Sequence, residues 1–387
     1  MFDALKAQPQ DKILILMQQF RDDPRKDKID LGVGVYKDAQ GLTPVMRAVK
    51  TAEQQLWQAE TTKTYTGLAG DPGFVQAMAE LILGPGAQAA GAATPGGTGA
   101  LRQAFELIRH AAPGAKVWLP APTWPNHTAI LRYLGMDMAE YRYFDEDSGG
   151  LDMGGLLEDL GRVAAGDVVL LHGCCHNPTG ANPNPVEWQA IADVLAQRRA
   201  VALVDLAYQG FGDGLAEDAA ATRLLADKLP ELLIAASCSK NFGIYRERTG
   251  VLLALGGDRA RVQENLAWLN RMNYSFPPDH GARLVTMILK DATLRADWQA
   301  ELEQVRHGML ALRQALAQAL QTETRSDRFG FVAAHRGMFS RLGLTPDQVE
   351  RLRKDHGIYM VGDSRLNIAG LNAQTVTVLA KVVAGVL

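Results

Sequence analysis

Short apolar runs alternate with amphipathic helical patterns through the middle of the chain. The runs cover residues 117–122, 167–175, 200–208, 232–239 and 251–256. Because they are almost continuously apolar, they predict strands that are buried on both faces of a sheet. Between two of them, Asn184, Pro185 and Glu187 supply an N-cap, an N1 proline and a capping-box acid for a crossover helix. The pattern predicts an α/β fold with a mostly parallel sheet.

The pattern changes toward the C-terminus. From about residue 295, apolar residues recur every three or four positions and predict one long helix. Residues 329–334 have a strand pattern, and a further helix is expected between Thr345 and Gly357. These segments predict a smaller α+β unit, on which the first 45 residues are expected to pack. Earlier in the chain, the glycine-rich and alanine-rich stretch 84–100 is interpreted as a loop.

The length of 387 residues favours two unequal domains, since single hydrophobic cores rarely grow beyond about 300 residues. We expect an N-terminal arm over 1–10, a small domain formed by 11–45 together with 305–387, and a large domain over 46–304.

Charge and cysteine usage narrow the function. The chain has 40 basic and 43 acidic residues and a net charge of -3, so no basic field indicates a nucleic acid or a membrane as partner. Three cysteines cannot form a disulfide framework, and no apolar run reaches the roughly 18 residues of a membrane span. These features favour small-molecule chemistry in the cytoplasm.

Residues 94–110 place glycines directly before an amphipathic helix. Such a helix start offers free N–H groups and suits a phosphate. A dinucleotide fingerprint is disfavoured, because the run from Gly97 lacks the third glycine. A purely structural glycine loop remains the alternative.

Two charged residues lie at the ends of predicted strands. Asp205 interrupts an apolar strand and is followed by Tyr208; it would either hold a cation or cap the next turn. Lys240 follows another strand and has Arg246 and Arg248 nearby. A desolvated amine in such surroundings has a lowered pKa and can form a Schiff base, although an ordinary solvated lysine is the alternative.

The segment 172–180 contains two histidines and the adjacent Cys174 and Cys175. Their spacing does not match the usual pairs of metal ligands, so no metal is predicted. Asn177 precedes Pro178, which favours an extended conformation that would direct the Asn177 amide out of the strand end.

Six ordered motifs carry a resemblance. They are TPGGTGALR (94–102), PTWPNH (122–127), HGCCHNPTG (172–180), DLAYQGF (205–211), SCSKNFGIYRERTG (237–250) and SRLNIAG (364–370). Together they resemble the class I pyridoxal-phosphate aminotransferases, in the aspartate and aromatic-amino-acid branch, and most of all the bacterial aromatic enzymes. The resemblance extends from residue 31 to the C-terminus and implies the fold type I of pyridoxal-phosphate-dependent transferases, with the cofactor in the large domain.

The resemblance also implies roles for individual residues. Lys240 would bind pyridoxal 5'-phosphate as a Schiff base and transfer the proton, with Asp205 and Tyr208 as the other catalytic residues and His127 supporting Asp205. The remaining cofactor contacts would be Gly97, Thr98, Trp124, Asn177, Ser237, Arg248 and, from a partner subunit, Tyr65. The substrate would contact Gly34, Trp124, Asn177, Arg365 and, again from a partner, Arg271.

The implied protein is a homodimer with shared active sites. Its implied reaction is a ping-pong transfer, through the pyridoxamine form of the cofactor, of the α-amino group between tyrosine, phenylalanine, tryptophan or aspartate and 2-oxoglutarate. An aspartate aminotransferase with only weak aromatic activity is the alternative, because Arg271 fits a side-chain carboxylate.

Overall fold

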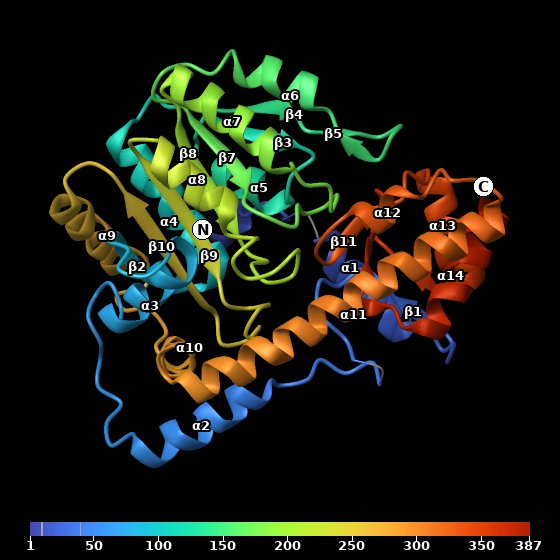
Figure 1. Ribbon diagram of the computed structural model, residues 1–387, viewed down its shortest axis with the longest axis horizontal. Helices are drawn as coiled ribbons and strands as arrows, with labels where there is room; N and C mark the ends of the chain where they lie inside the picture. Colours follow the sequence, from blue (N-terminus) through green and yellow to red (C-terminus); the bar gives the residue numbers. More distant parts are fainter. Residues whose placement is uncertain (9–10, 39) are drawn as a thin grey trace.

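The computed structural model describes residues 1–8, 11–38 and 40–387. Figure 1 shows a large part built around a central sheet and a smaller, mainly helical part beside it, joined by the long helix α11 (Ala292–Thr324). A short helix, η1 (Phe2–Ala4), lies in the predicted N-terminal arm, whose residues 9 and 10 fall outside the described residues.

The central sheet has seven strands in the order β2-β10-β9-β8-β7-β3-β4. The strands are β2 (Ala90–Pro95), β3 (Val117–Ala121), β4 (Met138–Arg142), β7 (Val168–His172), β8 (Val201–Leu206), β9 (Leu232–Ser237) and β10 (Thr249–Leu255). Only β10 runs antiparallel to its neighbours, which confirms the predicted mostly parallel α/β sheet. The five apolar runs each form a strand, and all five residues of β7 are buried.

Helices connect and cover these strands. In the first part of the chain they are α1 (Lys12–Asp22), α2 (Arg47–Ala59), α3 (Pro72–Leu83), α4 (Gly96–Ala111), α5 (Pro125–Leu134), α6 (Met153–Leu160) and α7 (Pro185–Arg198). They are followed by α8 (Ala220–Lys228), α9 (Arg259–Asn273) and α10 (His280–Lys290). The predicted capping box at the start of α7 is present, because Asn184 and Glu187 bond each other's backbone N–H groups. None of the helices in the described residues has the length and apolar character that crossing a bilayer requires.

The smaller part contains short strands and the last helices. Strand β1 (Ile29–Asp30) pairs with β12 (Ile358–Tyr359), and β11 (Phe339–Arg341) pairs with β13 (Arg365–Asn367), which precedes η2 (Ile368–Gly370). A hairpin, β5 (Phe144–Asp145) and β6 (Gly150–Leu151), belongs to the chain between β4 and α6. The helices are α12 (Phe331–Ala334), α13 (Pro346–His356) and α14 (Ala373–Val386). The β1–β12 pairing joins residues 29–30 to residues 358–359 of the C-terminal segment, and the packing of the first 45 residues as a whole on this part stays a prediction.

Two predictions of local structure were wrong. Residues 331–334 form α12 instead of a strand, because no strand among the described residues pairs with them. Residues 90–95 form the edge strand β2 instead of a loop, since β10 supplies the pairing and α9 packs against the strand.

Helix α11 contributes to two separate hydrophobic clusters. Leu302 and Met309 belong to the cluster that covers one face of the sheet, whereas Leu316 and Leu320 belong to the cluster of the smaller part. A helix of 33 residues is about 50 Å long, enough to extend through both. The division of the chain into domains at residues 10, 45 and 304 stays a prediction.

Candidate active site

Several of the site residues predicted from the sequence lie at the ends of strands, and these strands end at one edge of the sheet. Trp124 follows β3, Asn177 follows β7, Asp205 and Tyr208 lie at the end of β8, and Lys240 follows β9. These four strands are parallel, so their carboxyl ends meet at the same edge. Ligands bind at that edge in open α/β sheets.

A cavity of about 190 Å³ lies there. Eleven of the residues predicted from the sequence line it: Gly34, Gly97, Thr98, Trp124, Asn177, Asp205, Tyr208, Ser237, Lys240, Arg248 and Arg365. The two residues expected to act in a partner's site lie elsewhere. Tyr65 is 80% exposed and stacks on Phe276 at 4.6 Å, and the exposed Arg271 donates a hydrogen bond to the hydroxyl of Ser275.

Asp205 is held by a chain of hydrogen bonds behind the cavity. His127 Nε2 lies 3.0 Å from Asp205 Oδ2, and His127 Nδ1 lies 2.8 Å from the hydroxyl of Thr123. A carboxylate can only accept, so Nε2 of His127 carries the hydrogen of this bond, and Thr123 holds the other ring nitrogen. Burial alone would raise the pKa of Asp205, but the His127 hydrogen bond and nearby positive charge, including Lys240, hold the pKa below its usual value. Asp205 is therefore a buried anion.

Lys240 follows β9 and lines the same cavity. Its Nζ is 4.9 Å from the centre of the Tyr208 ring. Removal from water lowers the pKa of Lys240, the charge of Arg248 lowers it further, and Asp205 opposes both. A lowered pKa increases the fraction of neutral amine, which is the nucleophilic form.

One end of the cavity is suited to an anion. Helix α4 begins at Gly96 with no side-chain cap, so the first N–H groups of the helix remain available. A Cβ at Gly96 would lie 2.6 Å from Arg248 Nη2, and a Cβ at Gly97 would lie 3.0 Å from Ser237 Cβ. Gly96 has a φ of +71°, a conformation that favours glycine, and there is little space for a side chain at Gly97. The helix dipole and Arg248 favour a phosphate at this end.

The opposite end contains a buried arginine. Arg365 is 5% exposed, donates to the carbonyl of Gly32 at 2.9 Å, and reaches Asn177 Oδ1 at 3.4 Å. Its Nε has no hydrogen-bond partner among the described residues. Burial lowers the pKa of Arg365. A buried guanidinium with a free donor is suited to a ligand carboxylate.

Sequence reasoning gave no site role to some residues of the cavity. His172 is the last residue of β7, pairs with Asp205 in the sheet register, and lies 3.3 Å through Nε2 from Thr123 Oγ1. Burial lowers its pKa to about 3, so it is neutral. Phe339 lines the cavity with its ring 4.5 Å from Arg365 Cζ. The strand-end position of His172 was a usable signal, whereas Phe339 lies in a strand of three residues that pattern alone does not locate.

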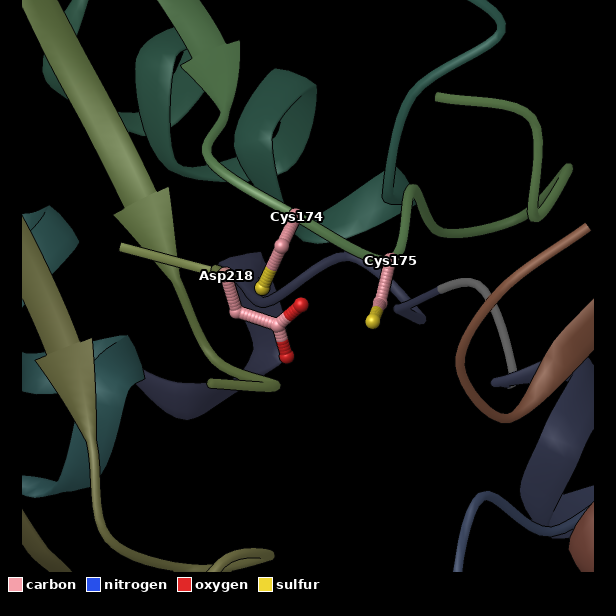
Figure 2. A group of neighbouring side chains, drawn as sticks. All are labelled: Cys174, Cys175 and Asp218. Carbon is pink, nitrogen blue, oxygen red and sulfur yellow. The ribbon is translucent and has the colours of Figure 1, made fainter. Parts of the chain in front are cut away.

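The cysteine pair next to this site faces a carboxylate. Figure 2 shows Cys174 and Cys175 on the segment after β7, with Asp218 close to both, and their ligand atoms lie within 4.8 Å of one another. The Asp218 oxygens already accept hydrogen bonds from three backbone N–H groups, at 2.8 to 2.9 Å. The mutual hydrogen bond and burial raise the pKa of Cys174, and burial raises that of Cys175, so both thiols stay protonated. The prediction that no metal binds stays untested.

Comparisons with known proteins agree with this geometry. The family described as "Aminotransferase class I and II" matches residues 26–383. The chain is 60% identical over 99% of both chains to an aromatic-amino-acid aminotransferase of Paracoccus denitrificans, and 42% identical over the full length of both to the aspartate aminotransferase of Escherichia coli. A crystal structure of the Burkholderia pseudomallei aromatic-amino-acid aminotransferase, covalently bound to pyridoxal phosphate, superimposes with a TM-score of 0.97 at 38% identity, covering 100% of this chain and 99% of that one.

The fold and the cavity define an enzyme that works with pyridoxal phosphate, and the chain belongs to the class I and II aminotransferases. Its residues fit the cofactor: an amine of lowered pKa, a buried carboxylate and an uncapped helix start line one cavity. The protein is therefore a pyridoxal-phosphate-dependent transaminase.

Proposed function

We propose that the protein transfers the α-amino group between aromatic amino acids or aspartate and 2-oxoglutarate. The substrates are suggested by the names of its relatives, which are aromatic-amino-acid and aspartate aminotransferases. One observation carries the proposal: Lys240, Asp205 and the buried Arg365 line a single cavity. An amine, a ring-nitrogen partner and a carboxylate clamp are the groups that this reaction needs.

At the cofactor end, Lys240 would attach the cofactor, and Gly97, Thr98, Ser237 and Arg248 would bind its phosphate. The uncapped start of α4 supports this assignment. Trp124 would cover the ring face, while Tyr208 and Asn177 would donate hydrogen bonds to its phenolic oxygen. When bound, pyridoxal phosphate supplies an aldehyde that takes up the amino group and a ring that accepts electrons.

The chain's own contribution to the chemistry is proton control. Asp205, kept anionic by His127, would hold a proton on the ring nitrogen; at about 3 Å and an effective dielectric near 20, such a pair is worth roughly 5 kcal/mol. Lys240 would move the proton to and from the substrate Cα, because an amine of lowered pKa can act as both base and acid near neutral pH.

At the substrate end, Arg365 would bind the α-carboxylate through its planar fork, assisted by Gly34 and Asn177. The free Nε of Arg365 supports this role. Gly34 is needed for space, because a Cβ there would lie 2.7 Å from the Phe339 ring.

We further propose a cytoplasmic homodimer in which Tyr65 and Arg271 complete the partner's site. Both side chains are exposed and lie outside the cavity of their own chain. Several large apolar side chains are also exposed on the same segments, including Trp57, Trp268 and Met272. Burial of such side chains between subunits is a general driving force for dimerisation. Three free cysteines agree with a reducing compartment.

The test is a comparison of kcat/KM for aspartate, phenylalanine and tyrosine with 2-oxoglutarate under identical conditions. Comparable values for acidic and aromatic substrates are expected. Values for both aromatic substrates about a thousandfold below that for aspartate would favour the alternative of an aspartate aminotransferase with weak aromatic activity. Release of carbon dioxide from aspartate would contradict transamination.

A further inference from the structure

A fully buried arginine lies behind the substrate end of the cavity. Arg313, on α11, is 0% exposed, and all five of its hydrogen bonds go to uncharged oxygens. Four of these are the carbonyls of residues 332, 336, 337 and 339, at 2.7 to 3.3 Å. Burying an arginine without a carboxylate partner is costly, so the segment that Arg313 holds deserves a functional explanation.

The fifth hydrogen bond is the first in a relay, a chain of hydrogen bonds whose donors and acceptors can be assigned in only one way. Arg313 Nη1 lies 2.8 Å from Ser340 Oγ, which lies 3.0 Å from His335 Nδ1; His335 Nε2 lies 2.7 Å from the carbonyl of Gly149. Because a carbonyl only accepts, Nε2 carries the hydrogen of a neutral imidazole, Nδ1 accepts from the hydroxyl, and the hydroxyl oxygen accepts from Arg313. The relay joins α11, the segment before β11 and the β5–β6 hairpin.

The segment held in this way carries Phe339 into the active-site cavity. The Phe339 ring lies 4.5 Å from Arg365 Cζ and edge-on to Tyr208 at 6.1 Å. On another side, a Cβ at Gly34 would lie 2.7 Å from the ring. The ring is 3% exposed and has neighbours on these sides, so its position depends on the backbone of 335–340 that carries it.

Arg365 depends on this ring for its position. The hydrogen bonds of its side chain are the one to Gly32 and the long one to Asn177, and the side chain forms no ion pair among the described residues. A cation over an aromatic face is attracted to it, so the Phe339 ring is the third support of the guanidinium.

We propose that Arg313 is a positioning residue for the substrate carboxylate. Arg313 fixes the backbone of residues 332–340 and thereby the position of the Phe339 ring. The ring in turn fixes the position of the Arg365 guanidinium. This inference rests on the proposed role of Arg365 as the carboxylate clamp. Arg313 itself does not line the cavity and acts only through the segment that it holds.

The experiment uses the holoenzyme and 3-phenylpropionate, which is phenylalanine without its amino group, as a probe of the carboxylate site. The variant Arg313→Met removes the hydrogen bonds while keeping much of the side-chain volume. Its dissociation constant for the probe, and KM for phenylalanine and aspartate, should rise about tenfold, with kcat changed less than about twofold. The cofactor absorbance band should stay unchanged, because the groups assigned to the cofactor belong to other segments. A general loss of structure would lower kcat and disturb this band as well.

Arg306→Met is the matched control. Arg306 lies on the same helix, but its side chain bonds Glu303 and His307 of α11. It should leave the probe affinity unchanged. Equal weakening in both variants, or unchanged probe affinity in folded Arg313→Met, would overturn the proposal.

Two further variants keep the test decisive. Ser340→Ala breaks the relay but leaves the four carbonyl contacts, so it should weaken probe binding about threefold; if Arg313→Met does not fold, unchanged affinity in Ser340→Ala overturns the inference. Arg365→Lys tests the underlying role. If it leaves probe binding intact, the proposed clamp fails; if it weakens binding while Arg313→Met does not, only the positioning role of Arg313 fails.

Discussion

Lowering the pH from 7 to 5 should destabilise the protein through His335. This histidine is 4% exposed, and its burial, with the charge of Arg313 nearby, lowers its pKa from the usual 6.5 to about 4. The folded protein therefore keeps His335 neutral at pH 5, whereas the unfolded chain binds a proton there. Because the unfolded state binds more protons, stability falls as the pH decreases through 6.5 and levels off below about 4.

The magnitude follows from the two pKa values. They differ by about 2.5, and each pKa unit is worth about 1.4 kcal/mol. The full loss in the free energy of unfolding, reached when the pH lies below both pKa values, is therefore roughly 3.4 kcal/mol. Between pH 7 and pH 5 the loss that belongs to His335 is about 2 kcal/mol. Other buried histidines, such as His172, add losses of the same sign in the same range.

A His335→Gln variant isolates this contribution. Glutamine stays neutral, so the variant lacks the proton linkage, while the other histidines contribute equally to both proteins. Free energies of unfolding in urea, measured at fixed protein and cofactor concentrations, should show the parent losing about 2 kcal/mol more than the variant between pH 7 and 5. The reasoning is refuted if the difference between parent and variant is the same at both pH values.

Three further predictions concern the active site. Borohydride reduction followed by peptide mapping should label Lys240, and Lys240→Ala should lose activity by several orders of magnitude; an unlabelled Lys240 would contradict its assignment. Asp205→Asn should lower kcat about a thousandfold while the protein remains folded, because an amide cannot hold the ring-nitrogen proton; a loss below about tenfold would contradict that role. If Arg271 of the partner subunit contacts the side-chain carboxylate and turns to solvent for aromatic substrates, Arg271→Leu should reduce kcat/KM about a hundredfold for aspartate and only slightly for phenylalanine, whereas equal losses would rule this out.

The elements that could be predicted are those that a short stretch of sequence specifies by itself. Continuous apolar runs located the five inner strands, and the Asn184 and Thr345 capping boxes located the starts of α7 and α13. The pattern failed at β2, whose alanines and glycine carry no strand signal and which is defined by its partner β10. It also failed at α12, where four residues are too short for any periodicity.

The site was predictable from strand-end residues, because parallel strands bring their carboxyl ends together. Asp205, Asn177 and Lys240 could therefore be grouped before any coordinates. Arg365 and Gly34 came only through family resemblance, since they belong to segments far apart in sequence. The support from Arg313 was inaccessible to pattern reasoning, because carbonyl groups converge on it from a turn whose shape the sequence does not specify.

The long helix α11 has a consequence for how this enzyme can be altered. The groups proposed for the cofactor lie mainly at one edge of the sheet, whereas Arg365 and Phe339 belong to the smaller part. Helix α11 packs in the hydrophobic clusters of both parts and connects them (Figure 1). Changes to the packing of Leu316 and Leu320 are therefore expected to alter the affinity for the carboxylate of the amino acid while leaving vitamin B6 retention intact, which would give protein engineers two separable controls on a single catalyst.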